Sequence, residues 1–101
     1  LKKFKDLVLQ FLDKSDLTVD FLSQHMGMSR VQLYRKLMAL TGVPASDFIR
    51  NIRLQKSAKL IKNNWGNISE VAYEVGFNNL SYFTKCFNET FGMTPSQFAK
   101  S

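Results

Sequence analysis

Apolar residues recur along the whole chain at the three- and four-residue spacing of amphipathic helices. The first run consists of Phe4, Leu7, Val8, Phe11 and Leu12. This spacing predicts a helix of about three turns with one buried face, and the polar segment Lys14–Asp16 would end it. No part of the chain shows the strict alternation of apolar and polar residues that is typical of a strand, so the sequence predicts an all-α fold.

Glycines placed after apolar runs mark the ends of the next two predicted helices. We expect one helix over Thr18–Met26, ended by Gly27. The next covers Ser29–Leu40 and is ended by Gly42. Its first residues, Ser29 and Gln32, have the spacing of a capping box. The positions expected to be buried are Val19, Leu22, Met26, Leu33, Leu37 and Leu40.

A long central helix is predicted to begin at Pro44, because proline is favoured at the first position of a helix. It reaches about Asn63, and its roughly 20 residues would span about 30 Å. Its inward positions are Phe48, Ile49, Ile52, Leu54, Ala58 and Ile61. The segment Asn63–Asn67 follows as a loop, in which we expect Trp65 to pack onto the core.

Three shorter helices are predicted after this loop: residues 67–75, a helix from 78 or 79 to 91, and a closing helix that carries Phe98. Gly76 and Gly92 end the first two. The residues expected to cap the three helices are Asn67 with Glu70, Asn78 or Asn79, and Thr94 with Pro95 and Gln97.

The two halves of the chain repeat each other at an offset of about 50 residues. Val19, Leu22, Ser23, Met26 and Gly27 match Ile68, Val71, Ala72, Val75 and Gly76; Leu33, Leu37, Gly42 and Phe48 match Phe83, Phe87, Gly92 and Phe98. Each copy is a helix, a glycine turn and a second helix, which are the components of a helix-turn-helix. We therefore expect seven helices, with two helix-turn-helix subdomains over residues 1–43 and 64–101 and a linker helix over 44–63.

Charge narrows the class of partner. The 101 residues include 14 Lys and Arg against 8 Asp and Glu, for a net charge of +6, which favours a polyanion such as nucleic acid or an anionic membrane face. A merely soluble basic domain stays open as an alternative. No apolar run approaches the roughly 20 residues of a membrane span, so we expect no membrane contact by this domain. Cys86 is the single cysteine, which favours the reducing cytoplasm.

The helix predicted over Ser29–Leu40 carries the chemistry for reading DNA. In a helix-turn-helix the second helix lies in the major groove and its first residues meet the base edges. Arginine suits guanine, glutamine suits adenine, and an apolar side chain suits the thymine methyl group. No acidic residue occurs from 27 to 41. The candidate contacts are Ser29, Arg30, Val31, Gln32, Tyr34, Arg35 and Lys36, with a solvated basic face as the alternative.

The corresponding helix of the second half is less basic. Its outward residues are Asn78, Asn79, Leu80, Ser81, Tyr82, Thr84 and Lys85. One cation among small polar groups favours contacts to the DNA backbone with limited base reading. A polar face without a ligand is the alternative here.

Other functions find little support in the residues. His25 is the only histidine, and no nucleophile with a base or set of metal ligands occurs, so we expect no catalytic site, metal or cofactor. Asp13, Asp16 and Asp20 are interpreted as helix-end charges. The strongest rival is a protein-interaction module that docks an acidic partner, such as a polymerase or an upstream receiver. RNA binding is a more distant alternative, because no sheet with stacking aromatic residues is predicted.

The chain resembles the AraC/XylS family of bacterial transcription regulators from about Leu17 to Phe98. The matching pieces are Gly27-Met28-Ser29, Leu33-Tyr34-Arg35-Lys36-Leu37, Thr41-Gly42, Arg53-Leu54, Ala58, Val71-Ala72, Gly76-Phe77, Tyr82-Phe83, Phe87, Phe91-Gly92 and Thr94-Pro95. The stretches 29–41 and 71–77 look most like the output domains of hybrid two-component regulators, which fuse sensor, kinase, receiver and DNA-binding domain.

This resemblance implies a homeodomain-like fold and sequence-specific binding of duplex DNA at promoters. The base contacts that it implies are Val31, Tyr34 and Arg35 in the first half, and Leu80, Ser81, Thr84 and Lys85 in the second. It further implies RNA polymerase as a partner, upstream receiver and sensor domains in the same chain, and dimerisation of the full-length protein. We expect the chain to be a piece of such a protein, whose sensor could carry a membrane anchor.

Overall fold

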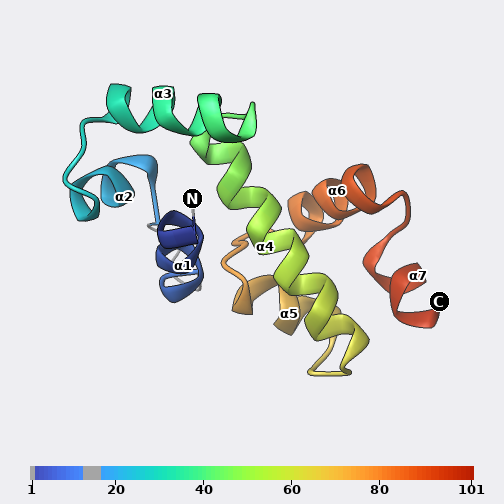
Figure 1. Cartoon of the computed structure of the whole chain (residues 1–101). Helices are drawn as coiled ribbons and strands as arrows, with labels where there is room; N and C mark the ends of the chain where they lie inside the picture. The colour runs from blue at the N-terminus through green and yellow to red at the C-terminus, as the bar shows by residue number, and fades with distance from the viewer. Residues whose placement is uncertain (1, 13–16) are drawn as a thin grey trace. The chain divides into compact units, whose positions relative to one another are not determined.

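The computed structural model describes residues 2–12 and 17–101, and within these residues the backbone forms seven helices and no strand (Figure 1). The all-α prediction is therefore confirmed. The predicted break at Lys14–Asp16 lies outside the described residues. Contacts divide the chain into two compact units, Leu1–Ile52 and Arg53–Ser101, which are described separately below. The predicted limits of the two subdomains and of the linker helix stay a prediction.

The first unit contains α1 (Lys2–Gln10), α2 (Val19–His25), α3 (Arg30–Thr41) and the start of α4 (Ala45–Lys62). Its buried apolar residues are Phe4, Val8, Leu12, Leu17, Leu22, Leu33, Leu37, Ala45, Ile49 and Ile52. Leu12 is buried although it follows the end of α1, which explains why the apolar stripe predicted a helix two residues longer.

One predicted core residue of this unit is wrong. Leu40 is 52% exposed, whereas Leu33 and Leu37 on the same helix are about fully buried. Leu40 lies in the last turn of α3, on the rim of a hollow of about 90 Å³ that Lys3 and Phe4 of α1 also line. The apolar spacing continues to the end of the helix, but α1 does not cover its last turn.

The turn between α2 and α3 forms the helix-turn-helix as predicted. Gly27 has a positive φ of 66°, and the amide of Met28 donates to the carbonyl of Ser23 at 2.9 Å. Ser23 is itself buried, so a larger side chain there would separate the two helices. Thr18 caps α2, with its side-chain oxygen accepting from the amide of Phe21 at 3.1 Å.

The second unit contains the rest of α4 together with α5 (Ile68–Glu74), α6 (Leu80–Phe91) and α7 (Pro95–Lys100). Its turn repeats that of the first unit, because Gly76 has a φ of 96° and the amide of Phe77 donates to the carbonyl of Ala72 at 2.9 Å. Asn79, rather than Asn78, caps α6. The internal repeat in the sequence is thus a repeat in local structure.

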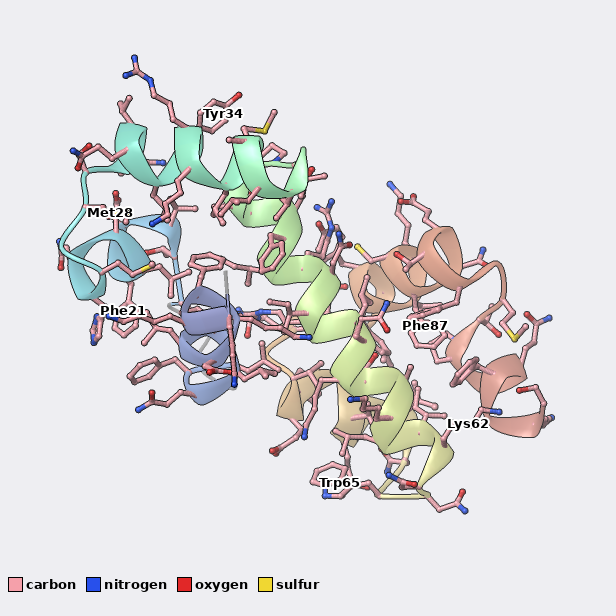
Figure 2. All side chains as sticks on the ribbon, in the orientation of Figure 1. Phe21, Met28, Tyr34, Lys62, Trp65 and Phe87 are labelled. Carbon is pink, nitrogen blue, oxygen red and sulfur yellow. The ribbon has the colours of Figure 1, made fainter. Side chains whose placement is uncertain are left out.

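Phenylalanine rings fill much of the core of the second unit. Phe87 packs against Phe83 at 5.7 Å and Phe91 at 4.5 Å between ring centroids, and it also meets Phe98 of α7 at 5.4 Å (Figure 2). Trp65, which was predicted to pack the loop onto the core, is 49% exposed. Its amide bonds to the carbonyl of Leu60 at the end of α4, and this bond holds the loop without burying the indole ring.

Among the described residues, no helix is both long and apolar enough to cross a membrane.

Candidate nucleic-acid interface

The N-terminal half of α3 presents exposed apolar side chains that a soluble helix would normally bury. Val31 is 57% exposed and Tyr34 is 50% exposed, and Tyr34 lies on the side of α3 turned away from α1 and α2 (Figure 2). Large apolar groups left in water on a helix of this kind favour an interaction surface. Both residues belong to the set predicted to contact DNA.

Arg35 occupies the centre of the outward face of α3. At 3.6 residues per turn it points directly opposite the midpoint between Leu33 and Leu37, which are buried in the core. Arg35 is exposed, and no acidic residue lies on α3 itself. The guanidinium is therefore free of local charge neutralisation from its own helix and suited to a guanine edge or a phosphate.

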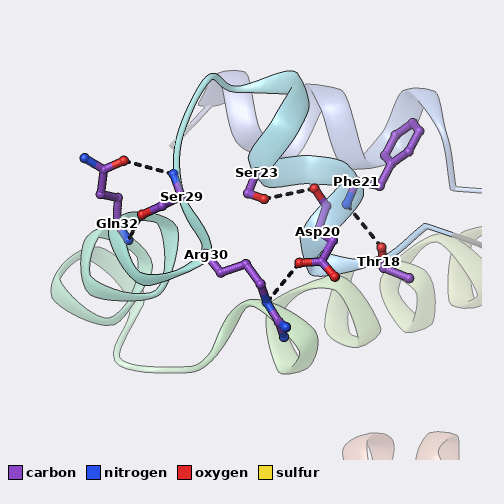
Figure 3. Close-up of polar contacts among 7 residues, drawn as sticks. All are labelled: Thr18, Asp20, Phe21, Ser23, Ser29, Arg30 and Gln32. Carbon is purple, nitrogen blue, oxygen red and sulfur yellow. Dashed lines mark hydrogen bonds and ion pairs between the residues drawn. The ribbon is translucent and has the colours of Figure 1, made fainter.

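Arg30 is held by a contact that the sequence did not predict. Its Nε lies 3.1 Å from Oδ1 of Asp20 in an ion pair, so the side chain reaches from the first turn of α3 back to α2 (Figure 3). The two side chains remain 69% and 60% exposed, which makes this a surface ion pair. Asp20 is indeed in the first turn of its helix, but it also bridges the two helices of the motif.

Gln32 has a structural role that competes with the predicted reading of adenine. Its Oε1 accepts from the amide of Ser29 at 2.9 Å, while the hydroxyl oxygen of Ser29 accepts from the amide of Gln32 at 3.1 Å (Figure 3). Bidentate pairing with adenine needs both the oxygen and the amino group of the side chain. While this capping box is closed, Oε1 already accepts one hydrogen bond and is held beside the Ser29 amide, whereas the amino group is uncommitted.

Lys36 lies on the side of α3 that meets α1. It lines the same hollow as Lys3, so the two lysines border one small basic region of the first unit. From the sequence, Lys36 was grouped with Arg35, and α1 was not connected with this basic region. The lysines at positions 2, 3 and 5 were the sequence feature that could have indicated it, and all three are exposed in the structure.

In the second unit, α6 repeats the arrangement of α3 with fewer charges. Lys85 is exposed and occupies the position of Arg35, opposite the buried Phe83 and Phe87. The position that matches Lys36 is Cys86, which is buried. The other predicted contact residues are exposed, except that Thr84 is half-buried: Asn79, Leu80, Ser81, Tyr82 and Thr84.

Asn79 and Tyr82 are tied to the structure of α6. Oδ1 of Asn79 accepts from the amide of Tyr82 at 2.9 Å, and the ring of Tyr82 lies 6.0 Å from that of Phe77. Tyr82 is still 48% exposed. Ser81, Thr84 and Lys85 are the polar residues of this face whose side chains have no capping role.

The remaining ionisable and metal-binding residue types do not assemble into a second site within the described residues. No group of three His, Cys, Asp or Glu side chains is close enough there to hold a metal ion. His25 stacks on Phe21 at 4.3 Å between ring centroids. Burial lowers the pKa of the Arg53 guanidinium, because desolvation disfavours its charged form.

The family of the chain follows from its match to a family model. A model described as a helix-turn-helix domain matches residues 22–101, which cover the second unit and the first unit from within α2 onward. The chain belongs to the AraC-type helix-turn-helix family. This membership, together with the fold, confirms the resemblance seen in the sequence.

Two relatives that share this domain are much longer than this chain. It is 40% identical over 98 residues to "Histidine kinase P4" of Formosa agariphila, covering 97% of this chain and 7% of that protein. It is 33% identical over 101 residues to the HTH-type transcriptional regulator MtrA of Neisseria gonorrhoeae, covering 98% of this chain and 34% of that protein. The chain therefore spans about a third or less of the length of these relatives.

Solved structures share the fold. The C-terminal domain of AraT, a response regulator from Geobacillus stearothermophilus, is 25% identical with a TM-score of 0.89, covering 98% of this chain and 82% of that one. The DNA-binding domain of AdpA, solved in complex with a target DNA, is 21% identical with a TM-score of 0.89, covering 98% and 88%. Membership in the AraC-type family implies that this domain binds DNA and regulates transcription.

Proposed function

We propose that this AraC-type domain binds duplex DNA sequence-specifically, with α3 and α6 in neighbouring major-groove segments on one face of the duplex. The observation that carries the proposal is the repeated arrangement of the two units: each second helix begins at a side-chain cap and presents one cation, Arg35 or Lys85, opposite its buried stripe. The first turn of such a helix meets the base edges in this class of motif.

The two helices are proposed to have different roles in binding DNA. Val31, Tyr34 and Arg35 combine an apolar surface, a phenol and a guanidinium, and are proposed to read bases. On α6 the residues Leu80, Ser81, Thr84 and Lys85 offer one charge and small polar groups, so this helix is proposed to contribute mainly backbone contacts and affinity. Ser29, Gln32 and Asn79 serve first as caps.

The length of α4 supports the proposal that α3 and α6 enter neighbouring major-groove segments. Its 18 residues correspond to about 27 Å of helix. Successive major-groove faces on one side of B-DNA lie about 34 Å apart. One chain is therefore proposed to contact two adjacent groove segments.

The domain is further proposed to be the output domain of a longer regulator of the two-component type. Support comes from the relative described as a histidine kinase, and from the response regulator AraT among the similar structures. In that setting upstream receiver and sensor domains, dimerisation and a contact with RNA polymerase in the cytoplasm are proposed as well. Dimerisation would raise avidity by increasing the effective concentration of the second domain.

Selection of bound duplexes from a random library, followed by footprinting, tests the DNA-binding proposal. We expect one enriched motif, two protected groove segments about one helical turn apart, and an affinity that falls steeply with salt. Binding without preference for the selected duplex over a scrambled one would instead favour the protein-interaction module. A single protected segment would contradict the use of both helices.

A further inference from the structure

The ion pair between Asp20 and Arg30 links the two helices of the first helix-turn-helix at the edge of the proposed DNA surface. Oδ1 of Asp20 lies 3.1 Å from Nε of Arg30 (Figure 3). Arg30 is the first residue of α3, next to the exposed Val31. An arginine at the start of a recognition helix is well placed to neutralise a phosphate, yet here an acidic residue already engages it.

The second unit lacks this pair, although it repeats the rest of the motif. By the register of the repeat, Ser69 stands where the first unit has Asp20, and Leu80 stands where it has Arg30. The helix-turn-helix therefore forms in the second unit without an ion pair between its helices. The pair in the first unit is thus not required by the fold, and an exposed pair of this kind adds little to stability.

An acidic side chain beside a cation changes how that cation binds DNA. A phosphate must compete with the carboxylate of Asp20 for the guanidinium, and the same carboxylate repels the phosphate. Contacts to phosphates supply most of the affinity for DNA of unrelated sequence, whereas contacts to bases supply the discrimination. Restraining a phosphate contact therefore weakens unspecific binding more than specific binding.

We propose that Asp20 is a specificity-determining residue, which engages the Arg30 guanidinium and so suppresses binding of the first unit to unrelated DNA. This inference rests on the proposed function, since it assumes that α3 faces the duplex. Asp20 acts through Arg30 and is a positioning residue, without a base contact of its own.

The test measures binding of the whole chain to a mixed-sequence duplex and to the selected duplex, each over a range of salt concentrations. The variants are Asp20→Asn and Asp20→Ser, the second of which installs the residue found at the matching position of the other unit. We expect both to raise affinity for the mixed duplex roughly two- to fivefold, as release from a surface ion pair predicts. The salt slope should steepen by about 0.9, because one further phosphate is neutralised. Affinity for the selected duplex should change less.

Three comparisons separate this role from a general effect of charge or folding. Glu74→Gln removes an exposed acid of α5 and should leave the slope unchanged. In an Arg30→Gln background, the substitutions at Asp20 should raise affinity clearly less, because only the direct repulsion between the carboxylate and the phosphate is then relieved. Arg30→Gln alone should alter affinity for the mixed duplex less than about twofold, because Asp20 already withholds this cation.

Several outcomes would overturn the inference. These are unchanged binding in both Asp20 variants, an equal gain without Arg30, a loss of affinity, or a fivefold drop in Arg30→Gln alone. Failure of the proposed function is distinguishable, because wild-type chain would then show no preference for any selected duplex, whatever the Asp20 variants do.

Discussion

Arg53 on α4 donates a hydrogen bond from Nη1 to the carbonyl of Gly76, the glycine of the second helix-turn-helix turn. The two residues are 23 positions apart in sequence, and the bond lies in the buried part of the second unit. A turn that reverses the chain leaves peptide groups without helical partners, and the guanidinium satisfies one of them. The position of α5 and α6 relative to α4 within this unit thus depends on a polar contact as well as on the aromatic core.

Replacing this guanidinium should destabilise the second unit. We expect Arg53→Met to lower the free energy of unfolding by about 1.5–3 kcal/mol, because the carbonyl of Gly76 would stay buried without its charged donor. Urea unfolding of the whole chain measures this. Lys56→Met, at an exposed position of the same helix, is the control and should change stability by less than about 0.5 kcal/mol. Equal losses in both variants would contradict this role of Arg53.

Arg35 should determine one base position of the recognised sequence. We expect Arg35→Ala to weaken specific binding by about 1–3 kcal/mol and to relax one position, because a bidentate contact to guanine would be lost. Arg35→Lys keeps the charge without the planar fork, so it should retain affinity for unrelated DNA and still lose discrimination. Duplex selection with each variant provides the measurement. Identical motifs for Arg35→Ala and wild type would remove Arg35 from base reading.

Gln32 should contribute more to the stability of α3 than to the recognition of bases. Because its side chain closes the capping box with Ser29, Gln32→Ala should reduce stability by about 0.5–1 kcal/mol and leave the selected motif unchanged. Gln32→Glu restores the cap, since glutamate also occupies this position in capping boxes, and should recover the stability. Thermal unfolding measures the stability of each variant, and duplex selection measures its motif. A motif that loses one adenine in Gln32→Ala would show that the cap opens on DNA.

Lys85 should supply affinity without much discrimination. Lys85→Ala is expected to weaken binding to all duplexes by a similar factor and to reduce the salt slope by about 0.9, as for one lost phosphate contact. Lys59→Ala removes an exposed lysine of α4 and serves as the control, against which the affinity and the salt slope of Lys85→Ala are compared. Titrations at several salt concentrations give both quantities. If substitutions of Ser81, Thr84 and Lys85 altered the motif while Arg35→Ala did not, the proposed division of work between α3 and α6 would be reversed.

The helices and their order were predictable from sequence, because they depend on local spacing and local caps. The pairs Ser29 with Gln32 and Asn67 with Glu70 form capping boxes in the structure, and Gly42 ends α3 in the left-handed conformation. Each of these features involves residues within one turn of each other. The internal repeat extended this local information to the two helix-turn-helix motifs.

Tertiary packing decided which side chains are covered, paired or still available, because these properties depend on residues that are distant in sequence. Leu40 was expected in the core and Trp65 was expected to pack onto it, yet the two residues are 52% and 49% exposed. The partner of Arg30 is Asp20 on another helix, and spacing along one helix cannot indicate such a contact. The local sequence therefore determined which residues lie on the outward faces of α3 and α6. The tertiary structure determined whether a cation on these faces has an acidic partner, because that partner comes from another helix.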